Sequence, residues 1–124
     1  MSDPFCDIVA SHGPATMVRE WPDAMAFLPR LDEQGRRGCT EGHILVVPRL
    51  HVDDAAANAV VTGQVAARAA ELAAARYSDF HLIVNKGVHA GMTVPHLHWH
   101  VVPRYPGDGL VMPWTAQQEE VRRG

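Results

Sequence analysis

Three histidines alternate with apolar residues near the carboxyl end of the sequence. They are His96, His98 and His100, and Leu97 and Trp99 separate them. Because successive side chains of an extended strand point to opposite faces of a sheet, this spacing predicts a half-buried strand with three imidazoles on its open face. A single histidine is usually a structural or surface residue, whereas three in this pattern indicate a functional site.

Two kinds of chemistry suit such a strand. A neutral imidazole is a common zinc ligand, although one ion bound by all three rings is difficult because His96 and His100 stand about 13 Å apart in a straight strand. Alternatively, one imidazole attacks the phosphorus atom of a substrate while its neighbours donate hydrogen bonds to the phosphate oxygens. His98 is the middle residue and has candidate donors on both sides. Upstream, Gly87 and Gly91 would let backbone N–H groups approach a phosphate closely.

The rest of the chain must supply a sheet that holds this strand. Apolar and β-branched runs predict strands at Ala15–Glu20, Met25–Leu28, His43–Pro48, Phe80–Asn85 and Pro95–Pro103. The first two are separated by Trp-Pro-Asp, which is typical of a hairpin turn.

An alanine-rich segment predicts one long helix over about residues 53–76. Asp53 or Asp54 would cap its N-terminus through a side-chain oxygen. The residues of one helical face recur at helical spacing and are Val61, Val65, Ala69 and Leu72. This face would pack on the side of the sheet to which Leu97, Trp99 and Val101 point. We therefore expect an α+β domain, in which a mostly antiparallel five-stranded sheet carries the helix on one face.

Length and composition fit one domain. The chain has 124 residues, of which 47% are hydrophobic and 20% charged, so we expect a single domain over residues 1–124, with a core at about 5–104 and a tail at 105–124 that includes the amphipathic run Trp114–Arg123. A formal charge of −3 leaves no overall positive field for DNA or RNA. Two cysteines, no signal-peptide pattern and no run of roughly 20 apolar residues predict a cytoplasmic protein that is not inserted in a membrane.

Four segments of the sequence resemble the histidine-triad (HIT) family. They are the triad itself with the following Val101-Val102, the N-terminal segment Phe5–Ala10, the glycine-histidine strand Gly42–His51, and the loop from Asn85-Lys86-Gly87 to Gly91-Met92-Thr93-Val94. They occur in the family's order and together span most of residues 5–103. The resemblance implies a HIT-like fold, including a short N-terminal helix.

The same resemblance implies a nucleotide hydrolase or transferase that acts at an α-phosphate. His98 would be the nucleophile that forms a covalent nucleotidyl-histidine, His43 and His100 would hold non-bridging phosphate oxygens, and His96 would lie behind the nucleophile. The substrate contacts implied by the family motifs are Phe27, Asn85, Gly91, Met92 and Thr93. The partners implied are a nucleotide substrate and a second copy of the chain in a homodimer, and catalysis would need no cofactor.

The sequence departs from the family pattern at three places. Met92 stands where many hydrolytic members have a glutamine whose amide lies near the leaving group. After Phe27, an acidic or amide-bearing segment that meets the ribose is replaced by Leu28-Pro29 and a longer charged loop, in which Asp32 is a candidate substitute.

The third departure concerns a structural zinc site that some bacterial-type members have. Cys6, His51 and His96 match its ligands, and Asp3 stands in place of the first cysteine. Because a carboxylate can also ligate zinc, an Asp3/Cys6/His51/His96 site is possible. The alternative is that Cys6 is a small buried apolar residue and His51 a surface residue.

These observations leave three functions open. The first is a HIT-type enzyme that cleaves a nucleoside phosphoramidate or a dinucleoside polyphosphate. The second is a nucleotide- or phosphate-binding module with weak catalysis, as Met92 and the altered ribose segment would permit. The third is a protein whose histidines chiefly bind metal.

Overall fold

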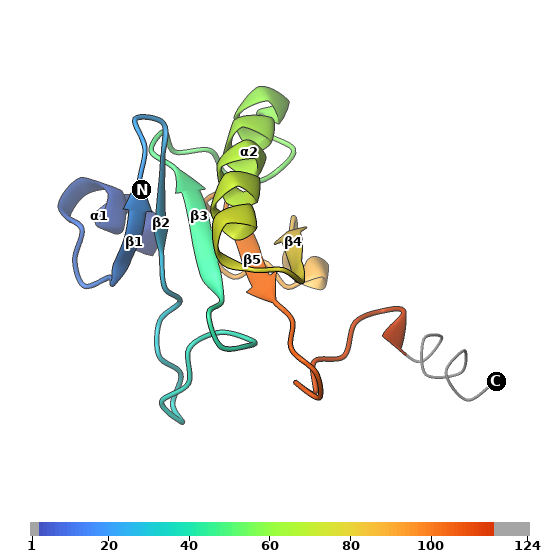
Figure 1. The fold of residues 1–124 in the computed structure, drawn as a ribbon. Helices are drawn as coiled ribbons and strands as arrows, with labels where there is room; N and C mark the ends of the chain where they lie inside the picture. Colours follow the sequence, from blue (N-terminus) through green and yellow to red (C-terminus); the bar gives the residue numbers. More distant parts are fainter. Residues whose placement is uncertain (1–2, 116–124) are drawn as a thin grey trace.

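The computed structural model describes residues 3–115 and contains the expected α+β fold (Figure 1). Its elements, in chain order, are α1 (Pro4–Ser11), β1 (Met17–Glu20), β2 (Ala24–Phe27), β3 (Ile44–Pro48), α2 (Ala59–Arg76), β4 (Phe80–Val84), the 3-10 turn η1 (Val88–Ala90) and β5 (Trp99–Pro103). The strands form one sheet in the order β1-β2-β3-β5-β4, and every neighbouring pair is antiparallel. The five-stranded sheet, the long helix and the short N-terminal helix are therefore confirmed.

The long helix begins later than the sequence pattern predicts. Its N-cap is Asn58, whose side chain accepts a hydrogen bond from the Val61 N–H group, and not Asp53 or Asp54. Asp54 instead accepts from the N–H groups of two following alanines and closes a separate turn before the helix. Alanine propensity is equally good on both sides of this point, so the polar caps decide where the helix starts.

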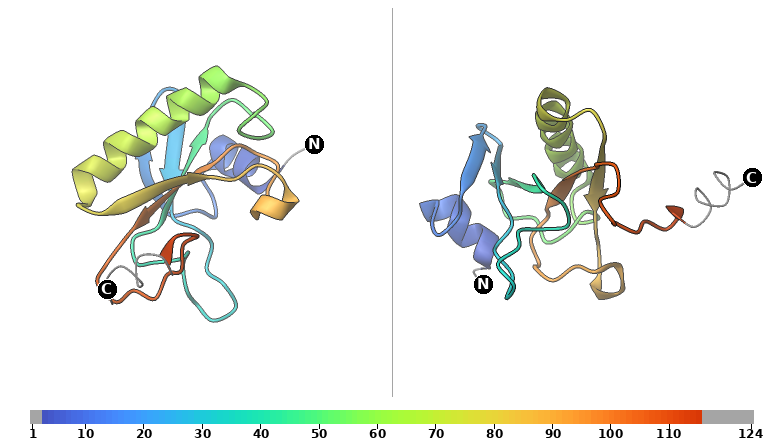
Figure 2. Two further views of the ribbon diagram at one scale, coloured as in Figure 1. Left: turned by 90° about the vertical axis from the view of Figure 1, so that its right-hand side faces the viewer. Right: turned by 60° about the horizontal axis from the view of Figure 1, so that its bottom comes forward.

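The two faces of the sheet bury separate groups of side chains. Figure 2 shows the ribbon of α2 lying across one face. Along β2, Ala24 and Ala26 pack under α2, whereas Met25 and Phe27 point to the opposite face, where α1 lies. The helix contributes mainly its predicted stripe, with Val65, Ala69, Leu72 and Ala73 buried. Small alanines on β2 allow the helix to approach the sheet closely, and the large side chains on the other face form a second core under α1.

The triad segment is only partly a strand. β5 begins at Trp99, not at Pro95. Pro95 has no N–H group to donate, and the Leu97 N–H group donates to the Val52 carbonyl at 2.6 Å instead of to β3. Nevertheless the alternation predicts the faces correctly, because Leu97, Trp99 and Val101 pack in the core under α2.

Two further segments border the sheet. The chain between β2 and β3, residues 28–43, projects beyond the sheet as a long loop (Figure 1). At the other end, most of the amphipathic run predicted at Trp114–Arg123 lies outside the described residues. Within residues 3–115, none of the helices is long and apolar enough to cross a membrane.

Candidate active site and metal cluster

The His98 ring is held in one tautomer by the backbone. Its Nδ1 atom lies 2.7 Å from the carbonyl oxygen of His96, and a carbonyl can only accept, so Nδ1 carries the proton. The Nε2 atom is therefore left with a free lone pair. The ring is 7% exposed and packs edge-to-face against Phe5, with 5.0 Å between ring centroids. Burial lowers the pKa of His98, so the ring is neutral and nucleophilic at neutral pH.

His43 and His100 form a hydrogen-bonded pair beside His98. The distance from His43 Nε2 to His100 Nδ1 is 3.0 Å, and the centroids of the His98 and His100 rings are 4.9 Å apart. Burial and the neighbouring His98 ring lower the pKa of His43 to about 4. Burial, His98 and His43 lower the pKa of His100 to about 4. The structure thus brings together three of the four catalytic residues predicted from the sequence, with the His100 ring in contact with those of both His43 and His98.

His96, the fourth, faces a different group of side chains. Its ring is fully buried, and its Nδ1 atom lies among potential metal ligands from three distant parts of the chain. Cys6 Sγ is 3.1 Å from His51 Nδ1 and 3.5 Å from His96 Nδ1, and the two ring nitrogens are 3.3 Å apart. The Asp3 carboxylate lies 3.1 Å from His51 Nδ1, 3.3 Å from His96 Nδ1 and 3.3 Å from Cys6 Sγ.

The 3.3 Å between the His51 and His96 nitrogens fits two ligands of one zinc ion, and Asp3 and Cys6 bring their ligand atoms to the same place. Two nitrogens bound to zinc at about 2.0–2.1 Å in tetrahedral geometry lie about 3.3 Å apart. The outward ring nitrogens are also occupied as metal-binding histidines require, because His51 Nε2 lies 2.8 Å from Asp53 Oδ1 and His96 Nε2 lies 3.3 Å from the Pro48 carbonyl oxygen. Both histidines therefore direct an Nδ1 lone pair at the centre of the cluster.

Asp3 has a second task that explains why an aspartate suits this position. It is the N-cap of α1 and accepts a hydrogen bond from the Cys6 N–H group at 2.8 Å. Burial opposes ionisation of Asp3, but this bond and the nearby His96 and His51 rings outweigh it, and the pKa of Asp3 falls below its usual value. Burial and Asp3 raise the pKa of the Cys6 thiol, an effect that a bound cation would reverse.

A cavity of about 530 Å³ opens on the α1 side of the sheet. Phe5, Ile8, Phe27 and Leu45 give it an apolar lining, and Arg30 and Arg37 are among the charged residues that complete it. Its volume suits a ligand of nucleoside size. Phe5 lies between the cavity and the His98 ring, because it lines the cavity and packs against the ring.

The predicted phosphate loop follows β4. Gly91 adopts a positive φ of 89° and stands next to Asn85, whose Nδ2 atom would be 4.0 Å from a Cβ at Gly91. Met92 is half-buried and Thr93 is exposed. Within residues 3–115, no hydrogen bond joins the side chains of Asn85 or Thr93 to a triad histidine, so their roles toward a substrate stay predictions.

The Asp32 side chain is bonded within its own loop. Its carboxylate accepts hydrogen bonds from the N–H groups of Gln34 and Arg36 and pairs with the Arg36 guanidinium, which closes a turn of the loop. It is not among the residues that line the cavity next to Phe5. The sequence places the Asp32 carboxylate near the expected ribose contact, and in the structure this carboxylate stabilises a turn of the loop.

Sequence reasoning missed Gly38 and Cys39. The Cys39 N–H group donates to His43 Nδ1 at 3.0 Å. A Cβ atom at Gly38 would lie 2.1 Å from the same nitrogen. Both residues lie only four or five positions before His43, but no residue pattern in this loop indicates that its backbone turns back onto the ring.

Comparisons with known proteins agree with this geometry. The chain is 35% identical over 115 residues to an uncharacterised HIT-like protein of Methanocaldococcus jannaschii, a match that covers 87% of this chain and 83% of the relative. It is 29% identical over 124 residues to an adenosine 5′-monophosphoramidase of Saccharomyces cerevisiae, with 94% of this chain and 72% of that protein covered.

Among solved structures, a zinc-bound histidine-triad family protein from Mycobacterium smegmatis superposes with a TM-score of 0.75 at 30% identity, over 99% of this chain and 89% of that one. The family model described as HIT domain matches residues 13–107, which include His43 and the complete triad. The chain therefore belongs to the HIT domain family.

Proposed function

We propose that this protein is a nucleotidyl hydrolase or transferase that acts at the α-phosphate of a nucleotide conjugate through a covalent intermediate on His98. The observation that carries the proposal is the short bond from His98 Nδ1 to the His96 carbonyl, which leaves Nε2 unprotonated in a ring that packs against Phe5, a residue of the cavity wall. The yeast relative named as a phosphoramidase supports this reaction class.

The reaction needs two displacements at phosphorus. In the first, the Nε2 lone pair of His98 forms a P–N bond while the bond to the leaving group breaks, and the leaving group takes up a proton from solvent. In the second, water attacks phosphorus and releases a proton to solvent, the P–N bond breaks and His98 regains its lone pair. The Nδ1 proton stays on His98 and is donated to the His96 carbonyl throughout, and that oxygen stabilises the positive charge of the nucleotidyl-imidazolium.

The remaining residues position the substrate. The cavity lined by Phe5, Phe27 and Leu45 would hold the nucleoside. His100 would donate to a non-bridging phosphate oxygen, and the Asn85 and Gly91 loop would approach the same group. Met92 offers no N–H donor, so recognition of the leaving group would rest on shape and on other residues.

A zinc ion would be held by Asp3, Cys6, His51 and His96. Bound there, it would cross-link α1 to the segments that follow β3 and precede β5, a structural task that needs no open coordination position. Because α1 forms one wall of the cavity, the metal would support the site without taking part in the chemistry.

The catalytic proposal is tested with a panel that includes an adenosine phosphoramidate and a diadenosine polyphosphate. We expect turnover by the wild-type protein, loss of turnover in His98→Ala, and a mass increase of one nucleotidyl group on quenched wild-type protein. His12→Ala is the matched control, since His12 is exposed and pairs with Glu20. Equal turnover by His98→Ala would remove His98 from the mechanism. Nucleotide binding in calorimetry without product would favour a binding module instead.

The two cysteines offer a matched test of the metal. Elemental analysis should find about one zinc per chain in the wild-type protein and in Cys39→Ser, and much less in Cys6→Ser. Cys39 is exposed and outside the four-residue cluster. Zinc content that is equally low in all three proteins would refute the site.

We also propose that the protein forms a homodimer. β4 lies at the edge of the sheet, and its five residues are only half-buried. Light scattering coupled to size-exclusion chromatography would give the mass, and a monomer at all accessible concentrations would refute the proposal.

A further inference from the structure

The loop between β2 and β3 contacts the Nδ1 atom of His43. A backbone amide can donate but cannot accept a hydrogen bond, so the Cys39 N–H group at 3.0 Å requires an unprotonated Nδ1 on His43. A neutral His43 then carries its proton on Nε2. That N–H group points at His100 Nδ1, 3.0 Å away. His100 Nδ1 accepts this bond, so the proton of a neutral His100 must be on Nε2.

The chain of donors ends at an atom that has no partner. His100 Nε2 is buried and forms no hydrogen bond within the part of the chain that the structure describes. A buried N–H group without a partner is costly in a folded protein and calls for an explanation. The explanation here is that His100 lies against His98, so a phosphate oxygen bound next to the nucleophile would accept a hydrogen bond from His100 Nε2.

The loop approaches His43 closely because residue 38 is glycine. Gly38 has a positive φ of 68°, and a Cβ atom there would meet His43 Nδ1 at 2.1 Å and Cγ at 2.6 Å. Any side chain would therefore push the ring or the loop aside.

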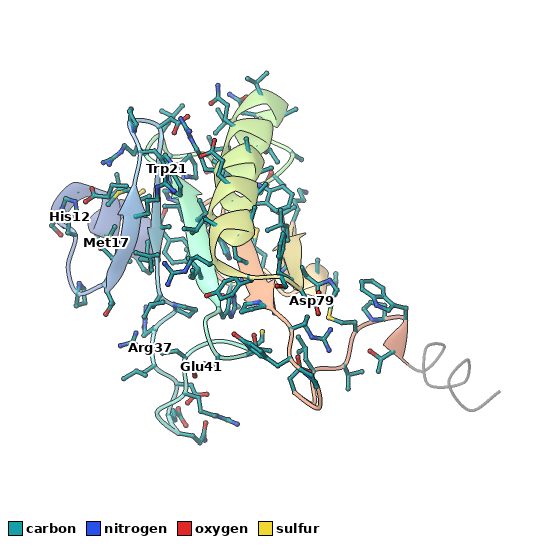
Figure 3. The ribbon with its side chains drawn as sticks, in the orientation of Figure 1. His12, Met17, Trp21, Arg37, Glu41 and Asp79 are labelled. Carbon is teal, nitrogen blue, oxygen red and sulfur yellow. The ribbon has the colours of Figure 1, made fainter. Side chains whose placement is uncertain are left out.

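Three hydrogen bonds hold the following loop segment, residues 40–42. The Thr40 hydroxyl donates to the Pro103 carbonyl at 2.6 Å in a buried bond. The Tyr77 and Tyr105 hydroxyls donate to the Gly42 and Glu41 carbonyls, each at 2.7 Å. Figure 3 shows Glu41 in this segment and Arg37 at the other side of the loop. The Cys39 amide is thus held in place by contacts to β5 and to the end of α2.

We propose that Gly38 and the Cys39 amide are positioning groups, which act through His43 to keep the proton of His100 on Nε2 as the donor for the substrate phosphate. In this scheme His43 does not contact the phosphate directly, because both of its ring nitrogens already have partners. The hydrogen bonds run from the Cys39 amide to His43 and from His43 to His100, and the loop holds the first donor in place. The inference rests on the proposed function for its role in catalysis, but the proton positions are a property of the free protein.

The test compares Gly38→Ala with Gly35→Ala. Both glycines lie in the same loop with similar positive φ angles, 68° and 76°, but a Cβ at Gly35 meets nothing within 4 Å. The two variants therefore carry the same backbone strain and differ in their contact with His43. Nitrogen-15 NMR of the imidazole rings identifies the protonated nitrogen in each histidine, and steady-state kinetics on the phosphoramidate separates kcat from KM.

We expect wild-type protein and Gly35→Ala to show His43 and His100 protonated on Nε2. In Gly38→Ala these tautomers should mix, the ring pKa values should rise toward ordinary ones, and kcat should fall roughly 10- to 100-fold with a smaller change in KM. His43→Phe provides a second route if Gly38→Ala does not fold, because it removes the donor to His100 and should release the His100 tautomer.

Two results would overturn the inference. One is a wild-type His100 protonated on Nδ1, and the other is an equal loss of kcat in Gly35→Ala and Gly38→Ala. If the tautomers are as expected but no substrate of the panel turns over, the proposed function fails while the positioning of the protons stands. If turnover is normal but the wild-type tautomers differ from those expected, the proposed function stands and the inference about the proton positions fails.

Discussion

We expect the free energy of unfolding to fall when the pH is lowered from about 7.5 to about 5. In the folded protein, burial lowers the pKa of His43 and His100 from 6.5 to about 4. In the unfolded chain both rings regain an ordinary value near 6.5. Between these values the unfolded chain binds more protons than the folded one, so stability is lost as the pH falls below about 6.5, and the loss is complete below about 4.

The magnitude follows from the two pKa values. A shift of one pKa unit corresponds to about 1.4 kcal/mol, so each ring withdraws about 2 kcal/mol of stability by pH 5. The two rings contact each other, so their contributions are not independent. Asp108, whose pKa Arg104 and neighbouring N–H groups hold low, contributes only at a pH below this range.

Urea unfolding at the two pH values measures the effect, with a chelator present so that metal release does not contribute. The pH-dependent loss should shrink by about 2 kcal/mol in His43→Phe, which keeps the ring volume but cannot be protonated. His12→Ala removes an exposed histidine and should retain the wild-type loss. An identical loss in the wild-type protein and His43→Phe would refute the idea that burial keeps this ring neutral.

Three further substitutions test packing and polar contacts by the same unfolding assay. Phe5→Ala should cost about 3–5 kcal/mol and weaken nucleotide binding, because Phe5 packs on Phe27 and His98 and lines the cavity; unchanged binding would place the nucleoside elsewhere. Thr40→Val should cost about 1–3 kcal/mol, since it leaves the buried Pro103 carbonyl without its donor. Asn58→Ala should cost about 1 kcal/mol through loss of the α2 cap, and no change would argue that the helix starts elsewhere.

Local patterns in the sequence determined the layers of the fold. Alternation along Leu97, Trp99 and Val101 assigned the face that packs under α2, even though β5 begins only at Trp99. The stripe of Val65, Ala69 and Leu72 assigned the buried face of the helix. Such patterns suffice because backbone geometry alone decides on which side neighbouring side chains emerge.

The same patterns could not show that His96 leaves the other triad members. Its sequence spacing suggests one row of three equivalent rings, but the segment before Trp99 leaves the sheet and turns His96 toward Asp3, Cys6 and His51. The sequence predicted these four residues as a possible zinc site only through family resemblance. Their approach to within 4.8 Å depends on how α1 docks on the sheet.

The tertiary structure decided which nitrogen carries the proton in His43 and His100. His98 is oriented by a carbonyl two residues away, and the sequence places that carbonyl within reach. His43 is oriented by an amide in a loop that contacts it only because Gly38 has no side chain and because Thr40 bonds to the end of β5. Tautomers follow from hydrogen-bond partners. Cys39 is only four residues from His43, but the loop that carries its amide is held by bonds to distant segments, which residue type and spacing do not show.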